Sequence, residues 1–173
     1  MSKNSLFIIV GSVLIIIFLA LYLLSPLYLP YYKIVDQTLK NNYKIVNADP
    51  NSNIKILELT TTNVNNTIYL LSNTSTVYLQ IINSSGLVAN NSEVLISKVY
   101  PGKYFITIDN PTNVSQKVLV RYAVFPYTQV SSLYSTLGII TTVSEFFIVL
   151  GIVALGYGVI SSIFSKKRFK RKK

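Results

Sequence analysis

The feature that most constrains this chain is an apolar run near its carboxyl terminus, over residues 146–164. The run holds 19 residues without a charged side chain. At a rise of about 1.5 Å per residue, a helix of this length spans roughly 28 Å, close to the hydrocarbon thickness of a bilayer. The sequence therefore predicts a transmembrane helix within residues 129–165. Residues 129–144, rich in Ser, Thr and Gly, are expected to be a lead-in, with the helix beginning near Leu133.

A strongly basic tail, residues 166–173, follows the apolar run directly. It contains no acidic residue and seven of the 16 lysines and arginines of the chain: Lys166, Lys167, Arg168, Lys170, Arg171, Lys172 and Lys173. Basic residues beside a spanning helix mark its cytoplasmic end. We therefore predict a cytoplasmic tail that contacts anionic lipid headgroups. Nucleic acid is not expected as a partner, because this charge does not lie on a folded face with interleaved aromatics.

A second uncharged apolar run covers residues 6–24. It exceeds the apolar core of a signal peptide, which is about 7–15 residues long, and no small-x-small cleavage site follows it. We predict a retained transmembrane helix within residues 1–29, with a cleaved signal as the alternative. Both termini are then cytoplasmic, and residues 30–128 lie outside the cell membrane or viral envelope. The tyrosines that flank the runs fit a belt at the outer interface or packing in the domain: Tyr22, Tyr28, Tyr31, Tyr32, Tyr127 and Tyr134.

The segment between the runs is predicted to be all-β. Residues 102–109 and 116–125 alternate between apolar and polar side chains and are separated by the turn-rich sequence NPTNVS. We expect these two strands to form a hairpin. Further strands are expected at 54–59, 67–72, 77–82 and 93–98, whereas residues 33–46 fit a linker, a short helix or a first strand. Short strands at this spacing predict an antiparallel β-sandwich ectodomain between the two transmembrane helices.

Five N-glycosylation sequons occur in the middle segment, at Asn65, Asn73, Asn83, Asn90 and Asn113. An Asn/Ser/Thr-rich chain makes some sequons by chance, but all five lie between the two apolar runs. Exposure outside the cell, with glycan on some of these asparagines, is the expectation.

Small residues recur at four-residue spacing in the second apolar run, at Ala154, Gly158 and Ser162, with Gly151 preceding them. Such a stripe allows close helix packing. The partner is either the first helix, near Gly11 and Ser12, or another subunit. Glu145 is expected at the outer interface of the membrane.

The residues that most enzymes and metal sites need are missing. The chain has no Cys and no His, which excludes disulfides, Cys/His metal sites and thiol or His-dependent nucleophiles. Residues 49–53 resemble the start of a calcium loop, but Ile54 and Thr60 stand where that loop needs Gly and Glu. An Asx turn explains these residues better. We therefore expect no cofactor, no metal and no enzymatic activity.

The composition resembles that of exported proteins of thermoacidophilic archaea or their viruses, with no specific motif behind the likeness. The leading hypothesis is a non-enzymatic two-pass protein that displays the β-sandwich for protein–protein or envelope contacts. One alternative is an accessory subunit of a membrane enzyme or transporter, held through the small-residue stripe. Another is a ligand- or sugar-binding sensor with a cleft lined by tyrosines such as Tyr69, Tyr78 and Tyr104.

Overall fold

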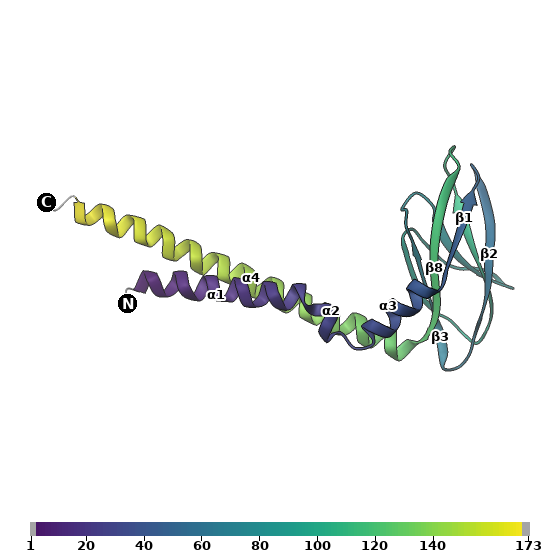
Figure 1. Cartoon of the computed structure of the whole chain (residues 1–173), viewed down its shortest axis with the longest axis horizontal. Helices are drawn as coiled ribbons and strands as arrows, with labels where there is room; N and C mark the ends of the chain where they lie inside the picture. The colour runs from purple at the N-terminus through teal and green to yellow at the C-terminus, as the bar shows by residue number, and fades with distance from the viewer. Residues whose placement is uncertain (1–2, 171–173) are drawn as a thin grey trace. The chain divides into compact units, whose positions relative to one another are not determined.

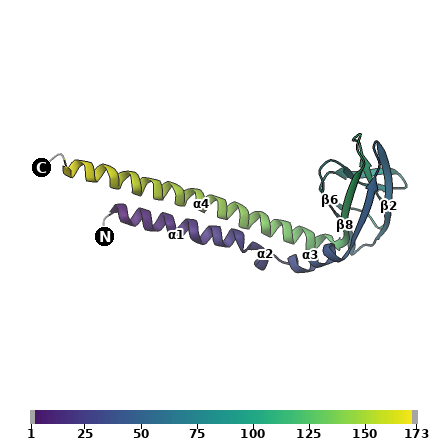
Figure 2. The same ribbon diagram turned by 45° about the horizontal axis from the view of Figure 1, so that its top comes forward.

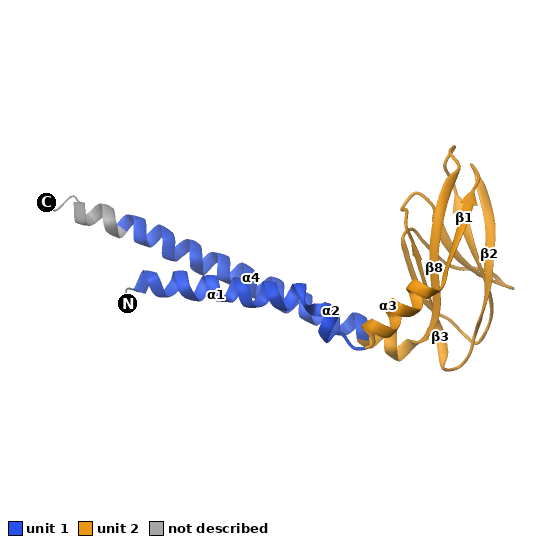
Figure 3. Cartoon of the chain, in the orientation of Figure 1, with its two compact units in different colours: residues 1–30, 133–173 blue, residues 31–132 orange. Residues whose placement is uncertain are grey.

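The computed structural model describes residues 3–170, with side chains described for residues 3–164. The chain divides into two compact units, coloured separately in Figure 3. The helical unit comprises Met1–Pro30 and Leu133–Lys173, and the β unit comprises Tyr31–Ser132.

The helical unit is built from α1 (Lys3–Leu23), α2 (Ser25–Tyr28) and most of α4 (Tyr127–Lys170). Helices α1 and α4 lie side by side and run antiparallel (Figures 1 and 2). Each is long and apolar enough to cross a membrane. The prediction that α4 begins near Leu133 is wrong, because α4 is helical from Tyr127. The Ser and Thr residues of 129–144 tolerate a helix, and no proline interrupts it.

The α1–α4 contact repeats every three or four residues on both helices. Buried or half-buried positions of α4 include Ser144, Phe147, Gly151, Ala154, Gly158 and Ser161, and those of α1 include Asn4, Ile8, Gly11, Ile15 and Phe18. A 3.5-residue repeat keeps one seam of each helix against its neighbour, as in a coiled coil.

Glycine lets the two backbones approach closely along this seam. A Cβ atom added to Gly11 would lie 2.6 Å from the carbonyl oxygen of Gly151 and 2.6 Å from the backbone nitrogen of Leu155. A Cβ on Gly158 would lie 2.7 Å from a side-chain carbon of Ile8. The Phe18 and Phe147 rings stack with their centroids 4.3 Å apart. The closest backbone approach is therefore at Gly11.

The small residues predicted to pack are not buried equally. Gly151 and Gly158 are buried and face α1 of the same chain. Ala154 is half-buried, and the Ser162 hydroxyl donates to the Gly158 carbonyl of its own helix at 2.8 Å. Ser161, which the sequence analysis missed, hydrogen-bonds Asn4 across the pair at 3.1 Å. The seam follows a seven-residue spacing, Ser144–Gly151–Gly158, rather than a four-residue one.

The β unit contains α3 (Tyr32–Asn41) and eight strands. The strands are β1 (Tyr43–Ala48), β2 (Ser52–Thr61), β3 (Asn65–Ser72), β4 (Tyr78–Asn83), β5 (Gly86–Asn91), β6 (Val94–Lys98), β7 (Gly102–Asn110) and β8 (Gln116–Pro126). They form two four-stranded sheets, sheet A in the order β1-β8-β3-β6 and sheet B in the order β2-β7-β4-β5. Every pairing within the sheets is antiparallel.

The core of the β unit lies between the inner faces of the two sheets. Fully buried side chains alternate along the strands: Ile68 and Leu70 in β3, Leu79 and Ile81 in β4, Ile106 and Ile108 in β7, and Val118 and Val120 in β8. This alternation places every second residue of each strand inside. The arrangement is sandwich-like, as predicted. Residues 33–46, left open by the sequence, form both α3 and β1.

The predicted hairpin over residues 102–125 is wrong. Strand β7 belongs to sheet B and β8 to sheet A, so the chain crosses from one sheet to the other between them. Both strands alternate because each contributes one face to the same core, and alternation alone does not distinguish facing strands from paired ones. The strand β5 was also missed, because its sequence GLVANN lies among the Asn, Ser and Gly clusters that predict connections between strands.

A buried carboxamide organises this crossing. The Asn110 side chain is fully buried, and its Nδ2 donates to the carbonyl oxygens of Ala48, Asp49 and Val114, each at 3.0 Å. Its Oδ1 accepts from the backbone nitrogen and the hydroxyl of Thr112, at 3.1 and 2.7 Å. One side chain thus joins the end of β1 to both ends of the β7–β8 connection.

We expect Asn110→Ala to destabilise the β unit by at least about 2 kcal/mol, since an unsatisfied buried polar group costs about 1–3 kcal/mol. The measurement is denaturant unfolding of the full chain in detergent, followed by the loss of β-sheet circular dichroism. Asn47→Ala, which removes an exposed asparagine of β1, is the control and should change stability little. Equal midpoints for the two variants would contradict this role of Asn110.

In the helical unit, we expect Gly11→Ala to weaken the α1–α4 pair by about 1–3 kcal/mol, as overpacking does when backbone leaves no room. The matched control is Gly156→Ala, because no atom lies within 4 Å of a Cβ at Gly156. The readout is disulfide formation between cysteines replacing Phe18 and Phe147 in each background. Unchanged cross-linking in the Gly11→Ala background would show that the close approach is not required.

Candidate interaction surface

The outer face of sheet A has a buried half and an exposed half. In the buried half, the outward side chains of Tyr69, Ala123 and Phe125 expose only 8%, 4% and 4% of their surface. Helix α3 contacts β8, as Figure 1 shows, and its Val35 and Leu39 are buried. Their burial shows that α3 packs against the β unit.

The other half of this outer face is open, and it is mainly apolar. Strand register aligns its side chains in one row across the four strands, Tyr43–Arg121–Leu71–Val94, with Ile45 opposite Leu119 in the next row. Tyr43, Ile45 and Val94 expose 55%, 50% and 39% of their surface. We call these six residues the open half-face.

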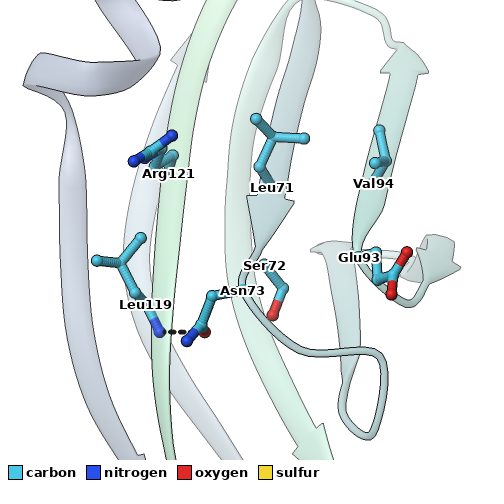
Figure 4. A pocket seen from close by; sticks show the side chains of 7 residues that line it. All are labelled: Leu71, Ser72, Asn73, Glu93, Val94, Leu119 and Arg121. Carbon is cyan, nitrogen blue, oxygen red and sulfur yellow. Dashed lines mark hydrogen bonds between the residues drawn. The ribbon is translucent and has the colours of Figure 1, made fainter.

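A pocket of about 350 Å³ lies on the open half-face, with its lining residues drawn in Figure 4. Leu71, Val94, Leu119 and Arg121 of the open half-face line it, together with Ser72, Asn73 and Glu93. Asn73 borders it just beyond the end of β3, where its Oδ1 accepts from the backbone nitrogen of Leu119 at 2.8 Å. The residues that line the pocket are therefore positioned by the strands, and the Asn73 side chain continues the hydrogen bonding of β3 to β8 beyond the end of β3.

Two opposite charges flank the apolar centre of this pocket. Arg121 lies on β8 and Glu93 immediately precedes β6, on either side of Leu71 (Figure 4). Within the described residues neither forms an ion pair, whereas Asp36 pairs with Lys40, and Glu58 with Lys55 and Lys103. Arg121 and Glu93 are thus available to a binding partner.

The outer face of sheet B is different, because its polar groups bind one another. Asn53 Nδ2 and the Thr107 hydroxyl both donate to Gln80 Oε1, at 2.9 and 3.1 Å. The Lys55 ammonium lies 3.6 Å from the centroid of the Phe105 ring. These polar groups therefore have partners within the face, although Tyr78 of β4 and Leu87 of β5 in this sheet are also exposed, at 44% and 57%.

The five sequon asparagines are distributed over the β unit. Asn65, Asn73, Asn90 and Asn113 are exposed, and Asn83 is half-buried. The Oδ1 atoms of Asn83 and Asn113 accept hydrogen bonds from Ser85 and Asn51. Only Asn73 of these five borders the open half-face, so the other four leave its pocket unobstructed.

The remaining sequence candidates do not converge. Tyr104 is in the core. Tyr69 is buried on the outer face of sheet A, and Tyr78 is exposed on sheet B, so these three tyrosines do not line one cleft. Residues 49–53 form a turn in which the Ser52 hydroxyl donates to the Asp49 carbonyl at 2.7 Å. Among the described residues, no group of His, Cys, Asp and Glu could hold a metal ion.

The charged residues near the carboxyl terminus are described only in part. Glu145 lies on an exposed side of α4. Lys166, Lys167, Arg168 and Lys170 lie in the last turns of α4, and their side chains are outside the described residues. Arg171, Lys172 and Lys173 lie wholly outside the described residues.

No protein-family model and no curated protein matches this sequence. Among solved structures, PliG from Aeromonas hydrophila, a periplasmic inhibitor of g-type lysozyme, aligns with 47% of this chain and 84% of its own, at 11% identity and a TM-score of 0.36. A de novo designed double-stranded β-helix aligns with 47% of this chain and 99% of its own, at 11% identity and a TM-score of 0.32. Similarities this low assign the chain to no family.

Proposed function

We propose that this protein is a non-enzymatic two-pass membrane protein that displays its β unit outside the cell or virion. In this proposal α1 and α4 cross the bilayer, and the open half-face makes protein–protein contacts. The proposal accounts for both units, because it gives the exposed apolar side chains of the helices a lipid environment and those of sheet A a protein partner.

The single observation that carries the proposal is the exposed apolar row on the outer face of sheet A, which surrounds a pocket and contains a cation without an ion pair among the described residues. Sheet B presents polar groups that bind each other, whereas the open half-face presents Tyr43, Ile45 and Val94 around an unpaired Arg121. Contiguous exposed apolar patches mark interaction sites. Tyrosine and arginine are also the residues enriched in protein–protein interfaces.

The basic tail and the sequons support the proposed orientation of the chain in the membrane. The basic tail favours a cytoplasmic carboxyl terminus, which puts both termini inside and the β unit outside. The five sequons of the β unit then lie on the side where N-glycans occur in exported proteins. Glycosylation and the choice between a cell membrane and a viral envelope belong to the proposal.

Neither alternative function has a specific observation in its favour. The accessory-subunit hypothesis placed its contacts along the small-residue stripe, but Gly151 and Gly158 already face α1. The sensor hypothesis required a tyrosine-lined cleft, and the three tyrosines named for it lie in different environments.

The orientation can be measured with single cysteines, because the natural chain has none. We expect a membrane-impermeant maleimide to label Thr60→Cys, exposed on β2, in intact cells. Ser165→Cys, next to the basic tail, should be labelled only after permeabilisation. The reverse pattern would overturn the proposed topology.

The use of the open half-face can be measured by photo-cross-linking in native membranes. A photoreactive residue replacing Leu71 should form adducts with another polypeptide, since Leu71 lies between Arg121 and Val94 on the open half-face. The same residue at Thr60, on the outer face of sheet B, is the control. If adducts at position 71 do not exceed those at position 60, the open half-face is not a contact surface.

A further inference from the structure

We propose that the partner of the open half-face is a second copy of this chain. The two copies are related by a two-fold axis parallel to β3 that passes over Leu71, and each Arg121 pairs with Glu93 of the other copy. This inference rests on the proposed function, because it names the partner of the surface described there.

The strand register supplies the geometry. Arg121, Leu71 and Val94 are direct neighbours across β8, β3 and β6. Adjacent strands lie about 4.8 Å apart, so Arg121 and Val94 are each about one strand spacing from Leu71, on opposite sides. A two-fold axis along β3 exchanges these two sides. It therefore places Arg121 of one copy over Val94 and the neighbouring Glu93 of the other.

Charge complementarity selects a second copy over an unrelated partner. The pocket is lined by one cation and one anion, and neither has an ion pair within the described residues. In a two-fold contact, residue i meets residue j and residue j meets residue i. Two Arg121–Glu93 pairs therefore form at once, and no charged group lining the pocket remains unpaired.

The apolar side chains fit the same arrangement. Leu71 lies on the axis and meets Leu71 of the second copy. Val94 lies beneath the aliphatic part of the second copy's Arg121, which covers apolar surface well. Tyr43 and Ile45, one strand beyond Arg121, flank the edge of the second copy at its β6. Two sheets packed face to face are about 10 Å apart, a distance that side chains of this size fill.

The Asn73 sequon borders the proposed dimer contact, so the effect of a glycan at Asn73 has to be separated from the effect of the contact itself. Ser75→Ala removes this sequon but keeps the Asn73 carboxamide and its hydrogen bond to Leu119. All measurements below therefore use the full chain carrying Ser75→Ala beside the natural chain, reconstituted in detergent micelles or lipid nanodiscs large enough for two copies.

The decisive test is a charge exchange. We expect Arg121→Glu alone and Glu93→Arg alone each to raise the dimer dissociation constant roughly 30-fold or more, since each change puts like charges together. The double variant R121E/E93R should restore dimerisation to near the natural level. A mixture of the two single variants should also restore it, because a heterodimer of these copies contains only opposite-charge pairs.

The geometry of the contact is tested by cysteine cross-linking under mild oxidation. Leu71→Cys, on the axis, should form a disulfide-linked dimer. Thr60→Cys, on sheet B, should not. Circular dichroism of every variant checks that the β unit is folded.

The outcomes separate this inference from the proposed function. If the natural chain is monomeric and Leu71 cross-links to a different protein in native membranes, the second copy is the wrong partner but the contact surface stands. If the chain dimerises but neither the double variant nor the mixture recovers, the Arg121–Glu93 pairing is wrong. If position 71 contacts no polypeptide at all, both proposals fail.

Discussion

The β unit depends on the burial of one face of sheet A against one face of sheet B. The chain has no cysteine, so no disulfide limits the unfolded state and the core has to supply the stability. Fully buried Ile, Leu and Val side chains from β3, β4, β7 and β8 provide it. The fixed orientation of these strands in turn determines which side chains are left on the two outer faces.

Buried polar side chains stabilise the places where the chain leaves the regular strands. The chain passes between the sheets after β7, and the backbone there leaves carbonyl groups without strand partners. Asn110, which is fully buried, donates to the Val114 carbonyl of this connection and to the Ala48 and Asp49 carbonyls at the end of β1. On the outer face of sheet A, Tyr69, Ala123 and Phe125 are buried, whereas Tyr43, Ile45 and Val94 are exposed.

In the helical unit, close packing depends on small side chains rather than on large apolar ones. Two apolar helices surrounded by lipid gain little hydrophobic free energy from burying surface against each other, so close association needs small side chains at the contact. Gly11, Gly151 and Gly158 provide this where the backbones approach. All three of these glycines face the other helix of the same chain. In a membrane, the exposed apolar side chains of α1 and α4 would remain for lipid.

The sequence by itself determined the two apolar helices, six of the eight strands and the sandwich-like class, because hydrophobic period and length are local properties. It did not determine that β7 and β8 lie in different sheets, since facing strands and paired strands show the same alternation. It also did not reveal the open half-face, whose members come from β1, β3, β6 and β8. Only tertiary structure decides which outward side chains are exposed together, because the strand register brings distant residues to one surface.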